Sequence, residues 1–267
     1  MKMNPKSVLL LTLDSCRYDT FLSANIPHFR ALGPVYRAQA PSYFTYASHA
    51  AMFVGFTPGV AELREPVANP KFSKLFRLGK VGFPGLNPGG FVLSGRSVPE
   101  GFRRLDYLTL GSGAVRWFDP ATPTGRSLTS DFDEFFYAGR NWGLAPQLEW
   151  LKARLSEAAW RPVFLFLNIG ETHVPYFHEG ATWSAEDNPC IPFQSVDRRD
   201  DCMTRQRACL EYVDRNCAWL LDAFSEATVM VTADHGDCWG EDGLWEHGIS
   251  HEMTLTVPLV FRVAKQL

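Results

Sequence analysis

Three continuous apolar runs constrain the fold of this chain most strongly. They are VLLLTL (8–13), VFLFLN (163–168) and ATVMVT (227–232). Runs without apolar–polar alternation are typical of strands that are buried on both faces of a parallel sheet. A shorter run at 258–262 predicts a further strand, and helical apolar spacing lies at 146–159 and 203–224. Strands alternating with helices predict an α/β fold with a mainly parallel sheet and helices on both faces.

Composition narrows the classes of partner and compartment. The chain has 267 residues, of which 46% are hydrophobic, which is enough for one large core. Lys and Arg number 26 against 29 Asp and Glu, so we expect no nucleic-acid partner. The run at 8–13 is far too short to span a bilayer and lacks a cleavage site, which predicts no membrane span and a cytoplasmic protein. Six cysteines without CxxC spacing favour neither a zinc ribbon nor a disulfide scaffold.

Two stretches differ from the strand–helix pattern. Residues 56–140 are rich in Gly, Pro and aromatic residues, and 178–202 combine Gly and Pro with acidic side chains. We expect loop-rich excursions there, with long loops and short elements that shape a cleft and select the substrate. The prediction is therefore a single domain over 1–267 with two elaborated segments.

Acidic and histidine residues gather after the strand at 227–232. Asp234 and His235 follow it directly, and His247 and His251 come shortly after. Asp14 follows the first strand in the same way. Open α/β sheets bind ligands at the carboxyl ends of their strands, and carboxylates with an imidazole suit a divalent cation. The sequence thus predicts a metal site at this edge.

A second feature is a helix that opens with hydroxyl residues and ends at Gly55. Ser42, Thr45 and Ser48 lie at its start. A Ser or Thr at this position commonly caps the helix. It can also act as a nucleophile, because the amino end of a helix binds an anion beside it.

Taken in order, these segments resemble the alkaline phosphatase and sulfatase superfamily. The residues that carry the resemblance are Asp14 with Arg17 and Asp19, IPHFRAL (26–32), the hydroxyl-headed helix, THVPY (172–176), Tyr212-x-Asp214, and ADHGDCWGEDGLWEHG (233–248) leading to VPL (257–259). The match runs from about residue 8 to residue 262 and keeps the motif order of the family. The resemblance implies a sulfatase-like catalytic domain with the α/β core of that family.

The resemblance places Thr45 at the position of the nucleophile. Sulfatases carry a Cys or Ser there, within C/S-x-P-x-R, which is converted to formylglycine; TYASH (45–49) lacks the convertible residue, the proline and the arginine. Thr45 and the histidine pattern are most similar to phosphoryl-transferring branches, phosphoethanolamine transferases above all. The resemblance implies that Asp14, Thr45, Asp234 and His235 hold one divalent cation. The imidazole favours zinc or manganese, with magnesium and calcium as alternatives.

The remaining histidines have expected roles of different kinds. By resemblance, His173 and His247 bind or protonate the phosphoryl oxygens, and His251 is a further substrate-binding candidate. A second metal ion stays open, because Glu171, His173, His178 and His251 offer ligands at an unusual spacing. We expect His49 and His178 at the solvent or at the cleft rim.

The predicted function is hydrolysis of a small-molecule phosphate mono- or diester through a phospho-threonine intermediate. Alternatives are a sulfatase, a transferase of the phosphoryl group to an alcohol, and a catalytically silent binder of a phosphorylated ligand. The sequence indicates neither the substrate nor the oligomeric state.

Overall fold

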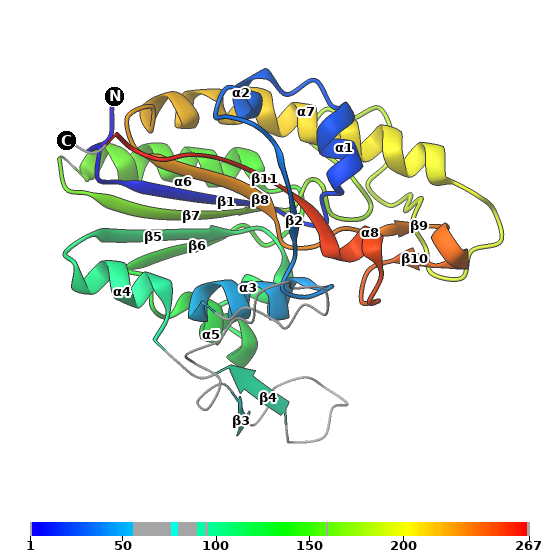
Figure 1. Ribbon diagram of the computed structural model, residues 1–267, viewed down its shortest axis with the longest axis horizontal. Helices are drawn as coiled ribbons and strands as arrows, with labels where there is room; N and C mark the ends of the chain where they lie inside the picture. Colours follow the sequence, from blue (N-terminus) through cyan, green and yellow to red (C-terminus); the bar gives the residue numbers. More distant parts are fainter. Residues whose placement is uncertain (1, 56–75, 80–89, 94–95, 159, 266–267) are drawn as a thin grey trace, which may run out of the picture.

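The computed structural model describes residues 2–55, 76–79, 90–93, 96–158 and 160–265, with 76–79 and 90–93 described by their backbone alone (Figure 1). Most of the first half of the predicted 56–140 excursion therefore lies outside the described residues. The strands are β1 (Val8–Leu13), β2 (Tyr36–Gln39), β3 (Phe76–Gly79), β4 (Gly90–Leu93), β5 (Leu108–Gly113), β6 (Glu134–Tyr137), β7 (Val163–Ile169), β8 (Thr228–Ala233), β9 (Cys238–Trp239), β10 (Trp245–Glu246) and β11 (Thr256–Arg262). The helices are α1 (Tyr18–Ser23), α2 (Pro27–Arg30), α3 (Thr45–Val54), α4 (Val98–Arg104), α5 (Pro123–Thr129), α6 (Leu144–Glu157), α7 (Arg199–Ala223) and α8 (Glu252–Leu255), with 3-10 turns η2 (Arg116–Phe118) and η3 (Glu241–Gly243).

The central sheet has seven strands in the order β2-β11-β8-β1-β7-β5-β6. The strands β8, β1, β7, β5 and β6 are parallel, and β11 runs antiparallel to both β8 and β2. The mainly parallel α/β fold predicted from the apolar runs is confirmed. The strand register determines which residues meet at the edge of the sheet, because Leu13 pairs with both Ile169 and Ala233. The residues after these strands therefore leave the sheet at one level.

Helices cover both faces of the sheet, as Figure 1 shows. On one face lie α1, α2, α6 and α7, and on the other α3, α4 and α5. Side chains alternate along β1: Leu9, Leu11 and Leu13 join the core beneath α7, while Val8 and Leu10 pack toward the core of α3. Both faces of β1 thus pack against apolar side chains, one of them only partly buried, which is the reason that its sequence is apolar without alternation.

The second half of the predicted 56–140 excursion contributes to the sheet. β5 and β6 lie there, beside the short helices α4 and α5. Within the predicted 178–202 excursion, α7 begins at Arg199. Both stretches thus combine irregular chain with elements of the core.

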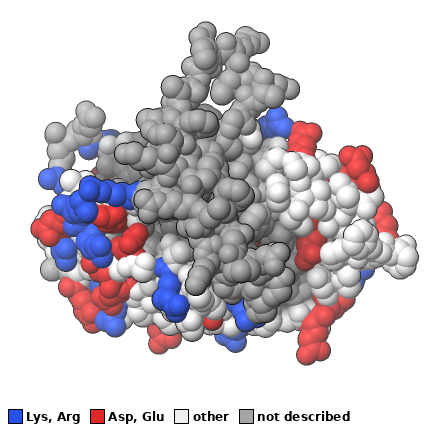
Figure 2. Space-filling model, turned by 90° about the horizontal axis from the view of Figure 1, so that it is seen from below, with Lys and Arg blue, Asp and Glu red and all other residues white. Residues whose placement is uncertain are grey.

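The described surface carries charges of both signs. On the face seen in Figure 2, Lys and Arg side chains lie among Asp and Glu side chains on the left, while the described surface on the right is mostly uncharged with scattered acidic side chains. Nucleic-acid-binding proteins instead gather basic residues on one face. None of the helices in the described part of the chain combines the length and apolar character that a membrane crossing requires.

Candidate active site

Four buried side chains meet at the carboxyl edge of the sheet. Asp14 follows β1, Asp234 and His235 follow β8, and Thr45 is the first residue of α3; all four are 0% exposed. The Thr45 Oγ1 atom lies 3.4 Å from Asp14 Oδ2 and 3.3 Å from His235 Nε2. The His235 Nε2 atom lies 3.6 Å from Asp234 Oδ2 and 3.8 Å from Asp14 Oδ1. The structure brings together the four residues that the resemblance assigned to a cation.

The donor atoms fit one divalent cation. Two ligands of a tetrahedral zinc ion lie about 3.4 Å apart, close to the separations found here. The Asp234 Oδ2 atom is buried and has no hydrogen-bond partner among the described residues, as expected for an atom reserved for a cation. His235 Nδ1 lies 3.0 Å from the Gly236 carbonyl oxygen, so this nitrogen carries the proton and Nε2 keeps its lone pair for the site.

The electrostatics of this group also favour a cation. Burial raises the pKa of Asp234 to about 7. Burial, and then repulsion by Asp234, raises the pKa of Asp14. Burial also lowers the pKa of His235 to about 4, so its imidazole is neutral. Because the protein supplies no positive charge within this group, a bound cation would compensate the two carboxylates.

The backbone after β8 is shaped to present His235. Asp234 Oδ1 accepts hydrogen bonds from the backbone N–H groups of Ser15 and His235, at 3.1 and 3.0 Å. The Gly236 N–H donates to the Thr254 carbonyl oxygen at 2.8 Å. A Cβ atom at Gly236 would lie 2.2 Å from the Met253 carbonyl oxygen, so only glycine fits.

Polar side chains from two other elements support Asp14. The Asn168 amide, at the end of β7, donates to Asp14 Oδ2 at 3.3 Å. The Thr172 hydroxyl donates to the Asp14 carbonyl oxygen at 2.7 Å. From α7, the Gln206 amide donates to the carbonyl oxygens of Ser15 and Thr172, at 2.9 and 3.0 Å. One buried glutamine thereby joins the two loops beside the candidate cation site.

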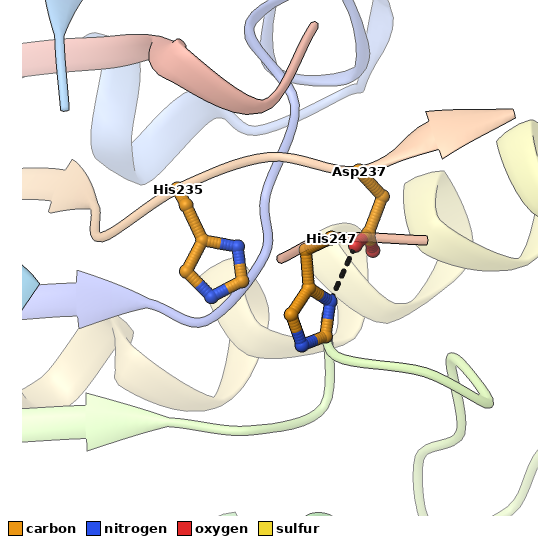
Figure 3. A group of neighbouring side chains, drawn as sticks. All are labelled: His235, Asp237 and His247. Carbon is orange, nitrogen blue, oxygen red and sulfur yellow. Dashed lines mark hydrogen bonds and ion pairs between the residues drawn. The ribbon is translucent and has the colours of Figure 1, made fainter. Parts of the chain in front are cut away.

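His247 lies against His235 and is held by Asp237. β9 and β10 form a short antiparallel ribbon in which Glu246 pairs with Cys238, so the next residues, His247 and Asp237, lie opposite each other. His247 Nδ1 and Asp237 Oδ1 are 2.8 Å apart, and the rings of His235 and His247 have centroids 4.5 Å apart (Figure 3). Burial would lower the pKa of His247, but the charge of Asp237 and their hydrogen bond prevail and raise it to about 9. Asp237 therefore favours the protonated, cationic form of His247.

His235, Asp237 and His247 also form a second group of potential ligand atoms. The 2.8 Å between His247 Nδ1 and Asp237 Oδ1 is a hydrogen-bond distance, shorter than the separation of two ligands on one ion. Asp237 consequently accepts a hydrogen bond from the His247 imidazole, and the two side chains are not ligands of one metal ion.

His173 completes a row of three imidazoles. Its ring centroid lies 5.1 Å from that of His247. The His173 Nδ1 atom is 2.7 Å from the Val174 carbonyl oxygen, which the Asn141 amide also contacts at 3.2 Å. With Nδ1 engaged in this way, Nε2 is the nitrogen left to contact a substrate.

Two other residues considered from the sequence, His49 and Ser48, are buried away from the rim and do not face Asp14. The expectation that His49 lies at the rim is wrong: it is 0% exposed, and its Nδ1 contacts the Thr45 carbonyl oxygen at 2.8 Å. His49 is instead surrounded by aromatic rings, and burial lowers its pKa to about 3. The Ser48 hydroxyl donates to the Ser42 carbonyl oxygen at 3.0 Å, so Thr45 is the hydroxyl that faces Asp14 and His235.

The residues considered for a second metal ion are not gathered. Glu171 Oε1 accepts the hydrogen bond of the Leu144 N–H at 2.8 Å, and burial raises the pKa of Glu171 to about 8. His178 stacks on Tyr212 with ring centroids 4.5 Å apart. His251 begins α8: its Nδ1 accepts from the Met253 N–H, and its Nε2 lies 3.2 Å from Asp242 Oδ2. Neither group of ligand atoms found in the described residues contains Glu171, His173, His178 or His251.

Sequence reasoning missed the supporting residues Asp237, Tyr176, Asn168, Gln206 and Asn141. Two had a signal: Asp237 stands two residues after His235, and Asn168 is polar within an apolar strand. Tyr176 stands within the THVPY motif, but the motif gave it no role of its own, and Gln206 and Asn141 had no signal in the sequence.

The sequence matches no protein-family model and no curated protein. Its structure resembles solved structures at low identity. A protein of the alkaline phosphatase superfamily from Vibrio parahaemolyticus has a TM-score of 0.57 and 15% identity, over 99% of this chain and 62% of that one. The soluble domain of lipooligosaccharide phosphoethanolamine transferase A from Neisseria meningitidis has a TM-score of 0.62 and 12% identity, over 99% and 78%.

A third similar structure is the zinc complex of the C-terminal periplasmic domain of EcEptC from Escherichia coli, with a TM-score of 0.61 and 14% identity, over 98% of this chain and 74% of that one. Two Bacteroides proteins assigned as sulfatases are similar as well. The chain therefore has the α/β fold of the alkaline phosphatase and sulfatase superfamily, as its motif order predicts, and it spans less than two thirds of the Vibrio protein.

Proposed function

We propose that this protein is a divalent-metal-dependent hydrolase of a small-molecule phosphate ester, with Thr45 as the covalent nucleophile. The observation that carries the proposal is the Thr45 hydroxyl, fully buried and within 3.5 Å of both Asp14 and His235. A hydroxyl that served only to cap the helix would contact backbone N–H groups rather than a carboxylate and an imidazole.

The cation site consists of Asp14, Thr45, Asp234 and His235. When bound, the cation lowers the pKa of the threonine hydroxyl and offsets the negative charge of the phosphoryl group. Zinc or manganese suits the imidazole and carboxylate ligands best, and one similar structure is a zinc complex.

The residues of the chain account for the remaining steps. The Thr45 hydroxyl directs its proton at Asp14, and Thr45 Oγ1 attacks phosphorus as the bond to the departing alcohol breaks. The first intrahelical bond of α3 runs from the Ser48 N–H to the Phe44 carbonyl oxygen, so the amides before it are open to an anion. His173 and His247 offer Nε2 to the phosphoryl oxygens, and the cationic ring of His247 can protonate the departing oxygen. Water then hydrolyses the phospho-threonine.

The test is turnover of nitrophenyl phosphate, its diester, a phosphonate ester and nitrophenyl sulfate, each with zinc, manganese or a chelator. We expect cleavage of a phosphorus ester that requires metal. Thr45→Ala should lose about a thousandfold or more in kcat, while the Thr45→Ser variant keeps a hydroxyl and part of the rate. Intact-mass analysis of acid-quenched enzyme should show one added phosphoryl group, absent from Thr45→Ala. Full activity of Thr45→Ala would refute the nucleophile.

Three alternatives have distinct outcomes in the same assays. Turnover of the sulfate alone would identify a sulfatase, the assignment of two similar structures. Phosphorylated alcohol as the main product, with an alcohol present, would identify a transferase, the activity in the name of the Neisseria protein. Metal binding and stabilisation by a phosphorylated ligand without any turnover would identify a silent binder.

We also propose a cytoplasmic location. All six cysteines are buried free thiols, which is typical of a reducing compartment. Cell fractionation tests this directly. Recovery of the native protein in the periplasmic fraction, the compartment named for the Escherichia coli domain, would refute it.

A further inference from the structure

A buried chain of hydrogen bonds leads from the protein interior to His247. The Trp239 Nε1–H donates to Tyr176 Oη at 2.8 Å, and Tyr176 Oη donates to Asp237 Oδ2 at 2.7 Å. The other oxygen of Asp237 lies 2.8 Å from His247 Nδ1. Trp239, Tyr176 and Asp237 are at most 1% exposed, so solvent does not compete for these bonds.

The direction of each bond in this chain follows from the donor and acceptor chemistry of its members. An indole N–H only donates, so the Tyr176 oxygen must accept from Trp239. A phenol has one proton, and it is therefore directed to Asp237, which must accept. With Asp237 accepting on both oxygens, His247 must donate from Nδ1. The His235 and His173 rings lie beside it, with centroids 4.5 and 5.1 Å away, and Figure 3 shows His247 Nδ1 directed at Asp237 with Nε2 on the side of the ring away from Asp237.

Tyr176 is rigidly held. Its N–H donates to the His173 carbonyl oxygen at 2.8 Å, within the turn that carries His173. Its ring packs edge-on against Trp239, at 6.0 Å and 78°, in a cluster with Cys190 and Cys202. One turn thus carries His173 itself and the tyrosine that contacts the acceptor of His247.

We propose that Tyr176 is a positioning residue that, by fixing the Asp237 carboxylate, determines the orientation of the His247 ring toward the phosphoryl group. Tyr176 itself touches no substrate. The inference rests on the proposed function for its kinetic consequences, whereas the ring orientation stands on the hydrogen bonds alone. The proposal requires the hydroxyl group of Tyr176 and not only its ring, because phenylalanine fills the same space without the hydroxyl.

The test compares Tyr176→Phe in the parent enzyme and in a His247→Gln background. Partners that orient a functional histidine change activity about 10–100-fold when removed, so we expect a loss of that size in kcat with KM changed less. In the His247→Gln background the same substitution should change kcat by less than about threefold, because nothing remains to be oriented. Tyr107→Phe is the matched control: it also removes a tyrosine hydroxyl bond, to the Lys6 carbonyl oxygen, on the surface.

Equal losses in both backgrounds would overturn the proposal, because Tyr176 would then act through general stability. An unchanged kcat of Tyr176→Phe would overturn it as well. If no phosphorus ester is turned over by the parent, the proposed function fails, and the ring orientation is read separately from crystal structures of the parent and of Tyr176→Phe. A His247 ring turned away from Asp237 in Tyr176→Phe would support the inference, and an unchanged ring orientation would refute it.

Discussion

The buried carboxyl of Glu171 allows a quantitative test of the effect of burial on the pH dependence of stability. Glu171 follows β7 and is 1% exposed. Its Oε1 atom accepts a hydrogen bond from the N–H of Leu144, the first residue of α6. Its Oε2 is buried without a hydrogen-bond partner among the described residues. Burial therefore raises its pKa from 4.5 to about 8, against the smaller opposing effect of the Leu144 hydrogen bond.

The sign of the effect on stability follows from this rise. The folded protein binds the Glu171 proton more tightly than the unfolded chain does. The contribution to stability is thus complete below pH 4.5 and is lost as the pH rises toward 8. A rise from 4.5 to about 8 predicts a loss of roughly 3 kcal/mol between pH 5 and pH 8. Glu171→Gln keeps the acceptor for Leu144 and cannot ionise, so the variant should lack this loss.

The assay is urea unfolding of the parent and of Glu171→Gln at pH 5, 6, 7 and 8, in a chelator so that metal binding does not contribute. The free energy of unfolding of the variant should rise relative to the parent by roughly 3 kcal/mol over this range. Glu226→Gln, at an exposed carboxyl, is the control and should show no such trend. A constant difference between the parent and Glu171→Gln would refute the reasoning, because Glu171 would then ionise inside the protein as it does in water.

Three further predictions concern the cation site. Zinc at 100 times its dissociation constant should stabilise the protein by about 2.7 kcal/mol, a rise of roughly 5–10 °C in Tm by calorimetry; an unchanged Tm would contradict a folded-state metal site. Gly236→Ala forces a Cβ atom against the Met253 carbonyl oxygen, so zinc titration should show affinity reduced at least about tenfold, and parent-like affinity would show that the turn can move. Asn168→Ala removes the amide donor to Asp14 and should weaken zinc about tenfold with little change in Tm, whereas a large drop in Tm at unchanged affinity would assign Asn168 to the core.

The strands of the sheet differ in how well their sequences predict them. β1, β7 and β8 were predicted because their residues, apart from threonines and Asn168, are apolar or small and do not alternate with polar ones. β5 reads LTLGSG and was not predicted as a strand. A Cβ atom at Gly113 would lie 2.4 Å from the Phe118 ring, so this strand uses glycine to admit an aromatic side chain. That requirement comes from a packing partner and leaves no periodic signal in the strand.

The sequence by itself determined that Asp14 and Asp234 lie at one edge of the sheet, because both directly follow buried strands and parallel strands end at one edge. It also determined that a hydroxyl-headed helix ends at Gly55, whereas the nucleophile role of Thr45 stays a prediction from the resemblance. Only the tertiary structure decided which histidine faces the site. His247 lies opposite Asp237 in the β9–β10 ribbon, whereas His251, four residues later, begins α8. Spacing cannot separate these outcomes, because the partner of a polar side chain is chosen by strand register and by burial, which arise only when distant segments pack.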